Sequence, residues 1–292
     1  MHRRDFLTAA GAAAVAPALA SAAPAAPGTA STQPDPAKGR LKQSVCRWCF
    51  SGIPLDELCR QAAAIGLKSV ELLGPDEWAE PARHGLVCAV ATNVSANPIG
   101  KGLNRVENHD AIVSQLESRL PEVAKAGIPN QIVFSGNRKG LPDDQGLANC
   151  VTGLKRIVPL AEKAGVTIIM ELLNSRRDHG DYMCDRTAWG VELVKRVGSD
   201  RFKLLYDIYH MQIMEGDVIA TITENAKFIG HYHTAGVPGR RDLDATQELN
   251  YPAICRAIAD TGFTGYFGQE FMPRDGKNAI AALRSAAVTC TV

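Results

Sequence analysis

The sequence predicts a single (β/α)8 barrel behind an N-terminal export signal and a linker, and three observations predict it. Short apolar runs alternate with longer amphipathic runs, as expected of strand-helix units around a parallel sheet. Four of the helical runs stop at a glycine directly before the next apolar run, at Gly66, Gly127, Gly165 and Gly262. Residues 41–292 amount to about 250 residues, the typical size of one such barrel.

The expected elements follow the chain in strand-then-helix order. The expected strands lie at 44–50, 69–73, 86–92, 130–134, 166–172, 202–207, 227–233 and 264–270. The expected helices lie near 54–65, 77–83, 106–126, 145–164, 185–198, 217–225, 250–261 and 277–288. Long polar loops at 93–105, 173–184 and 234–249 each follow a strand, and such loops extend from the catalytic face of a barrel.

The first 22 residues are expected to be a signal peptide. Arg3 and Arg4 precede an Ala-rich apolar run, and Ala20-Ser21-Ala22 forms a cleavage site of small residues. The N-terminus resembles a twin-arginine export signal, which implies a periplasmic or otherwise exported protein. An uncleaved tether is the alternative, but the apolar run is shorter than the roughly 20 residues that span a bilayer. Residues 23–40, rich in Ala, Pro, Gly, Ser and Thr, are expected to be a flexible linker.

Charge and hydropathy exclude some classes of partner, and the cysteines offer one possible metal or redox site. The formal net charge is +1 over 292 residues and no basic stripe is present, so no nucleic-acid partner is expected. No later segment is long and apolar enough for a stable membrane span. A small-molecule substrate is expected, and a homo-oligomer is compatible with the sequence. Cys46 and Cys49 have the spacing of a zinc or redox pair, but without a second pair they are interpreted as core thiols.

Four expected strands end on side chains that bind metals. These side chains are Glu171, Asp207, His233 and Glu270, spaced 36, 26 and 37 residues apart. Because the strands of a parallel barrel all deliver their last residues to one face, the four are expected to converge. Three carboxylates and one imidazole form a hard, oxygen-rich set, which suits Mn²⁺ or Mg²⁺ and would also accept Co²⁺ or Zn²⁺.

Other interpretations of these residues remain open. Asp207 and His210 have the spacing of an ordinary helix cap, and the carboxylates could form ion pairs in a metal-free core. His231 points the same way as His233 by strand alternation, but it lies further from the strand end and is the less favoured ligand. Trp48 and His179 lie on expected strand-end loops. His179, in the loop directly after Glu171, is the better candidate for substrate binding.

Several motifs in the second half of the chain match a known family. They are YDIYHMQ at 206–212 with GD at 216–217, HYHTAGVPGR at 231–240, ELNY at 248–251 and GQEF at 268–271. As an ordered set they closely resemble the hydroxypyruvate isomerase-like branch of the xylose isomerase-like barrel superfamily. The resemblance runs from about residue 44 to residue 285 and is densest from 166 to 275.

The resemblance implies roles for particular residues. It implies a divalent metal held by Glu171, Asp207, His233 and Glu270, with Glu171 and Glu270 also acting as the catalytic acid-base pair. His210 and Arg240 are similar to residues of the family that bind substrate oxygens. The hydroxypyruvate isomerase type carries Gln at the position of His233, whereas sugar epimerases of the superfamily carry His.

The expected activity is therefore enediolate proton transfer on a small hydroxy-carbonyl compound or sugar. Proton return to the neighbouring carbon is isomerisation, and return to the opposite face of the same carbon is epimerisation. A ketose 3-epimerase and a dehydratase remain alternatives, because the same ligands would serve all three reactions. The alternative outside enzymes is an exported sugar-binding protein.

Overall fold

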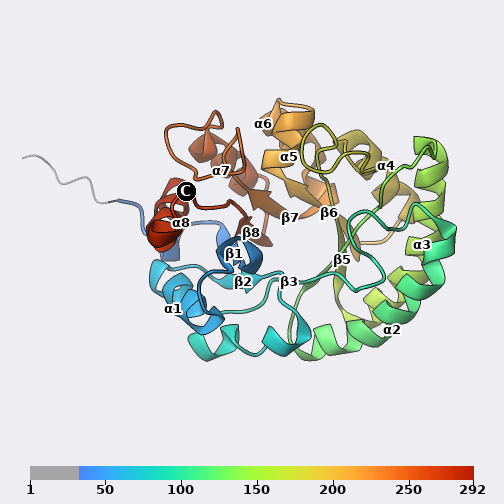
Figure 1. Cartoon of the computed structure of the whole chain (residues 1–292), viewed down its shortest axis with the longest axis horizontal. Helices are drawn as coiled ribbons and strands as arrows, with labels where there is room; N and C mark the ends of the chain where they lie inside the picture. Colours follow the sequence, from blue (N-terminus) through green and yellow to red (C-terminus); the bar gives the residue numbers. More distant parts are fainter. Residues whose placement is uncertain (1–32) are drawn as a thin grey trace, which may run out of the picture. The chain divides into compact units, whose positions relative to one another are not determined.

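The computed structural model describes residues 33–292, so the expected signal peptide and most of the expected linker lie outside the described residues. Eight parallel strands form a ring that is surrounded by helices, which confirms the expected barrel (Figure 1). The strands are β1 Lys42–Cys46, β2 Ser69–Glu71, β3 Val90–Ala91, β4 Asn130–Val133, β5 Thr167–Glu171, β6 Phe202–Asp207, β7 Ile229–Thr234 and β8 Tyr266–Gln269.

The ring closes unevenly. The hydrogen-bonded order is β2-β1-β8-β7-β6-β5-β4-β3, so the sheet opens between β2 and β3. Two isolated parallel bridges, Ser69 to Val87 and Leu73 to Ala91, span this gap. β3 has only two residues, so these isolated bridges, and not a continuous ladder, join the β2 side of the barrel to the β3 side.

The helices cover the outside of the ring (Figure 1). The α-helices are α1 Leu55–Ile65, α2 His109–Lys125, α3 Asp143–Ala164, α4 Thr187–Val197, α5 Ile208–Met214, α6 Val218–Asn225, α7 Tyr251–Asp260 and α8 Ala279–Thr289. Short 3-10 helices lie at Pro36–Lys38, Arg47–Phe50, Pro75–Glu77, Pro81–His84, Val106–Asn108, Ala226–Phe228 and Gly276–Asn278.

Three local expectations were wrong. The α-helix expected at 77–83 is replaced by two 3-10 helices, Pro75–Glu77 and Pro81–His84. Each begins with a proline that has no N–H to donate, and Pro81 would disrupt a continuous helix. The strand expected to reach residue 50 stops at Cys46, where Arg47–Phe50 turns into a 3-10 helix. The short helix Ile208–Met214 was not expected, because an apolar strand runs directly into it.

The glycine stops are confirmed. Gly66, Gly127, Gly165 and Gly262 all have positive φ, at 103°, 71°, 71° and 79°. This left-handed conformation ends the preceding helix and is accessible to glycine without a steric cost. The chain therefore turns back toward the barrel at the same structural signal each time.

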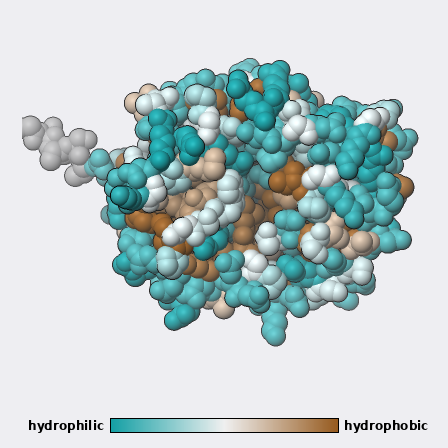
Figure 2. Space-filling view, viewed as in Figure 1, coloured by the Kyte–Doolittle hydropathy of each residue, from teal (hydrophilic) through white to brown (hydrophobic). Residues whose placement is uncertain are grey.

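The segment before β1 contacts the barrel. The Arg40 N–H donates to the carbonyl oxygen of Val292 at 2.9 Å, and the Arg40 side chain pairs with Asp260 at 2.8 Å. The described residues contain no helix long and apolar enough to cross a membrane. On the face shown in Figure 2, hydrophobic residues lie inside a central hollow and hydrophilic residues predominate around it.

The loop at 93–105 packs tightly on the end of β4, and this predicts the effect of one substitution. A Cβ atom at Gly102 would lie 2.4 Å from the backbone of Phe134 and Gly136. We expect Gly102→Ala to lower the free energy of unfolding by about 1–3 kcal/mol, because backbone atoms must shift. Chemical denaturation measures this loss. Gly52→Ala is the control, since a Cβ there meets nothing within 4 Å, and equal stability of the two variants would contradict the tight packing.

Candidate functional site

Four side chains from consecutive strands meet at the carboxyl ends of the barrel. Glu171 and Asp207 are the last residues of β5 and β6, His233 lies near the end of β7, and Glu270 directly follows β8. All four are buried. One ligand atom from each lies within 4.8 Å of the others. The barrel thus brings together the side chains that the strand ends predict, and this donor set fits a hard divalent cation.

Hydrogen bonds connect the cluster internally. His233 Nδ1 lies 3.1 Å from Glu171 Oε1 and 2.9 Å from Glu270 Oε2. The Glu270 N–H donates to the carbonyl oxygen of Thr234 at 2.9 Å, which continues the β7-β8 ladder beyond the end of β8. The backbone that carries Glu270 is therefore fixed by the sheet.

Arg240 compensates the negative charge of the cluster from the loop after β7. Its guanidinium lies 2.5 Å from Glu270 Oε2 and 3.3 Å from Asp207 Oδ2. The same group lies over the rings of Trp48 and Tyr209, with its carbon 5.1 and 5.5 Å from the ring centroids. Trp48 Nε1 donates to the other carboxylate oxygen of Glu270 at 2.8 Å. Glu270 is thus held by two donors from different loops.

The pKa values of Glu171 and Glu270 are shifted in opposite directions. Burial and the charge of Glu270 raise the pKa of Glu171. Burial also favours the neutral form of Glu270, but Arg240 and His233 outweigh it and hold the pKa of Glu270 well below its usual range. Burial raises the pKa of Asp207 although Arg240 opposes the change. Burial alone would lower the pKa of His233, but Cys46, Glu270 and Glu171 outweigh it and raise the pKa well above the usual value.

The two carboxylate oxygens of Asp207 contact different groups. Its Oδ1 accepts from the backbone N–H groups of Tyr209 and His210 at 2.8 and 3.2 Å, so it caps α5. Its Oδ2 faces Arg240. The helix cap and the cluster ligand, which the sequence left as alternatives, are therefore compatible in one carboxylate.

His210 is fully buried beside the cluster. Its Nδ1 lies 2.6 Å from the side-chain amide nitrogen of Asn174, and its Nε2 lies 3.6 Å from Asp207 Oδ2. Nε2 has no hydrogen-bond partner among the described residues. Burial and the nearby Arg240 lower the pKa of His210 well below its usual value, so the imidazole is kept neutral.

A cavity of about 420 Å³ opens onto Glu171, Glu270 and Arg240. His179 lines it and packs edge-on against His210, with ring centroids 5.2 Å apart. The remaining lining residues are mainly apolar. They are Trp48, Leu72, Thr92, Asn93, Ile99, Ile132, Phe134 and Leu173. Of the expected site residues, His210, Asp207 and His233 do not line this cavity but lie behind its polar wall.

Sequence reasoning missed Glu71, a fully buried carboxylate at the end of β2. Its Oε1 lies 2.8 Å from His231 Nε2 and 2.9 Å from His233 Nε2. Burial would raise the pKa of Glu71, but the two histidines outweigh it and lower the pKa. The one available signal was a carboxylate inside the apolar run 69–73.

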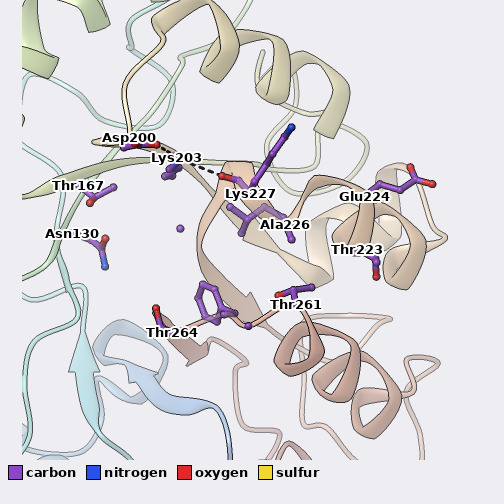
Figure 3. Close-up of a pocket in the computed structure, with 15 residues that line it drawn as sticks. Asn130, Thr167, Asp200, Lys203, Thr223, Glu224, Ala226, Lys227, Thr261 and Thr264 are labelled. Atoms are coloured by element: carbon purple, nitrogen blue, oxygen red, sulfur yellow. Dashed lines mark hydrogen bonds and ion pairs between the residues drawn. The ribbon is translucent and has the colours of Figure 1, made fainter.

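A larger cavity, of about 690 Å³, lies at the opposite, amino-terminal ends of the strands. Figure 3 shows that it is bordered by Asn130 and Thr167, at the starts of β4 and β5, while Glu224 points away from it. Lys203 Nζ is satisfied there by Asp200 at 3.2 Å and by the Lys227 carbonyl oxygen at 3.1 Å. Among the residues that the structure describes, no group of three potential metal ligands lies in this cavity, in contrast to the carboxyl ends.

Comparison with known proteins agrees with the barrel fold. The family model described as xylose isomerase-like TIM barrel matches residues 59–287. A 2-oxo-tetronate isomerase of Cupriavidus necator is 37% identical over 143 residues, which cover 48% of this chain and 54% of that protein. The chain thus matches about half the length of that relative.

Two further proteins match over more of their length. Hydroxypyruvate isomerase of Escherichia coli is 31% identical over 225 residues, covering 73% of this chain and 86% of that protein. The structure of D-psicose 3-epimerase with D-tagatose from Clostridium cellulolyticum H10 superposes with a TM-score of 0.71 at 16% identity, covering 86% of this chain and 100% of that one. The chain belongs to the xylose isomerase-like TIM barrel family.

Proposed function

We propose that this chain is a divalent-metal-dependent isomerase or epimerase that acts on a small hydroxy-carbonyl compound or sugar. The observation that carries the proposal is geometric: Glu171 and Glu270 line one cavity, and a carboxylate oxygen of each lies within 4.8 Å of the other. Their pKa values are shifted in opposite directions, which accords with it. Two carboxyl groups driven apart in this way can divide the work of acid and base. The isomerases and the epimerase with which the chain shares its fold support the same class of reaction.

Glu171, Asp207, His233 and Glu270 would hold the cation. When bound, a divalent cation supplies Lewis-acid chemistry that polarises the carbonyl of a hydroxy-carbonyl substrate and acidifies the neighbouring C–H. Ionised Glu270 then takes that proton, and the C–H electron pair becomes part of an enediolate. Arg240 and Trp48 keep Glu270 ionised and oriented toward the cavity.

The second proton transfer decides the product. If Glu270 returns its proton to the neighbouring carbon while a proton moves between the two oxygens, an aldose and a ketose interconvert. If Glu171 delivers its own proton to the opposite face of the same carbon, the centre is inverted. Both routes conserve the atoms of the substrate and need no oxidant. After inversion Glu270 carries the proton it took and Glu171 has lost its own, so proton exchange with solvent returns the pair to its starting state.

The residue at position 233 and the similar proteins favour different routes. The histidine at position 233 favours an epimerase, in particular a ketose 3-epimerase, since sugar epimerases of the superfamily carry His there. The similarity to hydroxypyruvate and 2-oxo-tetronate isomerases favours an isomerase of short hydroxy-carbonyl acids. We propose isomerisation as the principal activity. A dehydratase would require expulsion of a β-hydroxyl, and a sugar-binding protein would have no use for the acid-base pair.

Substrate oxygens would be bound by Arg240 and His179, which line the cavity. Neutral His210, whose Nε2 has no hydrogen-bond partner in the part of the chain that the structure describes, lies behind them as a further hydrogen-bonding group. We also propose that the chain is exported, on the basis of the paired arginines and the apolar run that follows them.

The first prediction concerns the cation and the proton transfer together. We expect the purified protein to bind about one Mn²⁺ or Mg²⁺ per chain, and chelation to lower its melting temperature, because a ligand present at 100 times its Kd stabilises by about 2.7 kcal/mol. In D₂O, NMR of ketoses, aldoses and hydroxypyruvate should show deuterium entering one substrate carbon. Metal binding without exchange on any compound would favour the lyase or binding-protein alternatives.

The second prediction concerns pH. The pKa values of Glu171, Asp207 and His233 are raised in the metal-free protein, so these groups keep protons to higher pH than usual. A cation must displace those protons, and its affinity should therefore fall as pH falls. Calorimetric titration with Mn²⁺ at pH 6, 7 and 8, in buffers of different ionisation enthalpy, should show proton release on binding. Affinity independent of pH would contradict this charge arrangement.

The third prediction tests the base. Glu270→Gln should lower kcat by at least about 10²–10⁴-fold, which is the usual contribution of a general acid or base, while the circular dichroism spectrum stays unchanged. Glu248→Gln is a matched control, because Glu248 is exposed and its carboxylate bonds only to Gln212 among the described residues. Substantial turnover by Glu270→Gln would remove Glu270 from the chemistry.

A further inference from the structure

Behind the four-residue cluster lies a further group of buried polar side chains. At its centre is Glu71, and both imidazoles of β7 contact the same carboxylate oxygen of this residue. His231 Nε2 lies 2.8 Å and His233 Nε2 lies 2.9 Å from Glu71 Oε1. The Cys46 thiol donates to that oxygen as well, at 3.5 Å. All four residues are 0% exposed, so no solvent competes for these bonds.

The barrel is shaped to admit this carboxylate. β1 lies between β2 and β8, and Cys46 on β1 is paired in register with Glu71. On the other side of β1 from β2, the neighbouring strand β8 carries Gly268. A Cβ atom at Gly268 would lie 2.5 Å from Glu71 Oε1 and 2.9 Å from His233 Cδ2. A side chain at 268 would therefore occupy the space in which Glu71 meets the imidazole.

The ionised Glu71 carboxylate determines which ring nitrogen of His231 and of His233 carries hydrogen. An ionised carboxylate only accepts hydrogen bonds, so the Nε2 atoms of His231 and His233 must both carry hydrogen. A neutral His233 with hydrogen on Nε2 has its lone pair on Nδ1. Nδ1 is the nitrogen that faces Glu171 at 3.1 Å and Glu270 at 2.9 Å.

We propose that Glu71 is a positioning residue that holds His233 in the Nε2–H tautomer and aims its Nδ1 lone pair at the cation site. The inference rests on the proposed function, because it assumes that Glu171, Asp207, His233 and Glu270 bind a divalent cation. A partner on the distal nitrogen orients a ligating imidazole and increases its basicity. Glu71 does not line the cavity, so it acts on the cation site only through His233.

The wild-type tautomer tests the inference directly. Long-range ¹H–¹⁵N correlation spectra of ¹⁵N-labelled full-length protein loaded with Zn²⁺ should show His233 with hydrogen on Nε2 and the metal-coordinated signature on Nδ1. The resonances are assigned by their loss in His233→Gln. Hydrogen on Nδ1 would overturn the proposal. A second Zn²⁺ held by Cys46, Glu71 and His233 would also overturn it, since that site needs the Nε2 lone pair.

Variants at position 71 distinguish the loss of a hydrogen-bond acceptor from a change in packing. Glu71→Leu removes the acceptor at similar volume and should weaken Mn²⁺ binding by about 10–100-fold, as is usual for loss of such a partner. Glu71→Gln should lose less than about 10-fold, because a single amide oxygen can still accept from both imidazoles. Equal losses in the two variants would overturn the proposal, as would unchanged Mn²⁺ affinity in folded Glu71→Leu.

The control for burial is Gln131→Leu. Gln131 is likewise 0% exposed on a barrel strand, and within the described part of the chain its side chain bonds only to backbone carbonyls of residues 91, 92 and 132. This variant should lose stability and keep its Mn²⁺ affinity. If wild-type protein binds no Mn²⁺, the proposed function fails together with this inference. If wild-type binds Mn²⁺ and Glu71→Leu binds it equally well, only the role of Glu71 fails.

Discussion

The barrel concentrates three carboxylates at one buried point, and the surrounding structure depends on how this charge is compensated. Glu171, Asp207 and Glu270 are each at most 5% exposed, so bulk water stabilises their charges only weakly. Uncompensated buried charges are strongly destabilising. The parallel strand direction places the three groups together, and the arrangement therefore requires cationic or hydrogen-bonding partners from other parts of the chain.

Those partners approach from two directions. From the loop side, Arg240 bonds Asp207 and Glu270, and its backbone carbonyl accepts from the Met272 N–H at 2.8 Å, which ties the loop to the segment after β8. From inside the barrel, Glu71 bonds His233. A cation bound between the carboxylates would share this compensation with Arg240, so charge balance and cation affinity are linked at the same atoms.

The cavity is divided between this polar cluster and an apolar wall. Glu171, Glu270 and Arg240 form its charged lining, and Leu72, Ile132 and Phe134 are among its apolar lining residues. Electrostatic interactions are stronger beside a wall that holds no water. A small hydroxy-carbonyl compound would therefore gain most by placing its oxygens toward the carboxylate cluster, which is also where proton transfer requires them.

By itself, the sequence determined the barrel, the glycines that end its helices and the placing of Glu171, Asp207, His233 and Glu270 at strand ends, because hydrophobic periodicity and the ends of strands are local properties. It misjudged 77–83, where Pro81 interrupts an apparently helical run. Only the tertiary structure decided that Glu71 meets His231 and His233, which lie 160 and 162 residues away in sequence. It also decided that Arg240 reaches Glu270. Such contacts form only when β1, β2 and β8 close beside β7, and no local pattern of residues encodes which side chain will lie opposite a buried carboxylate.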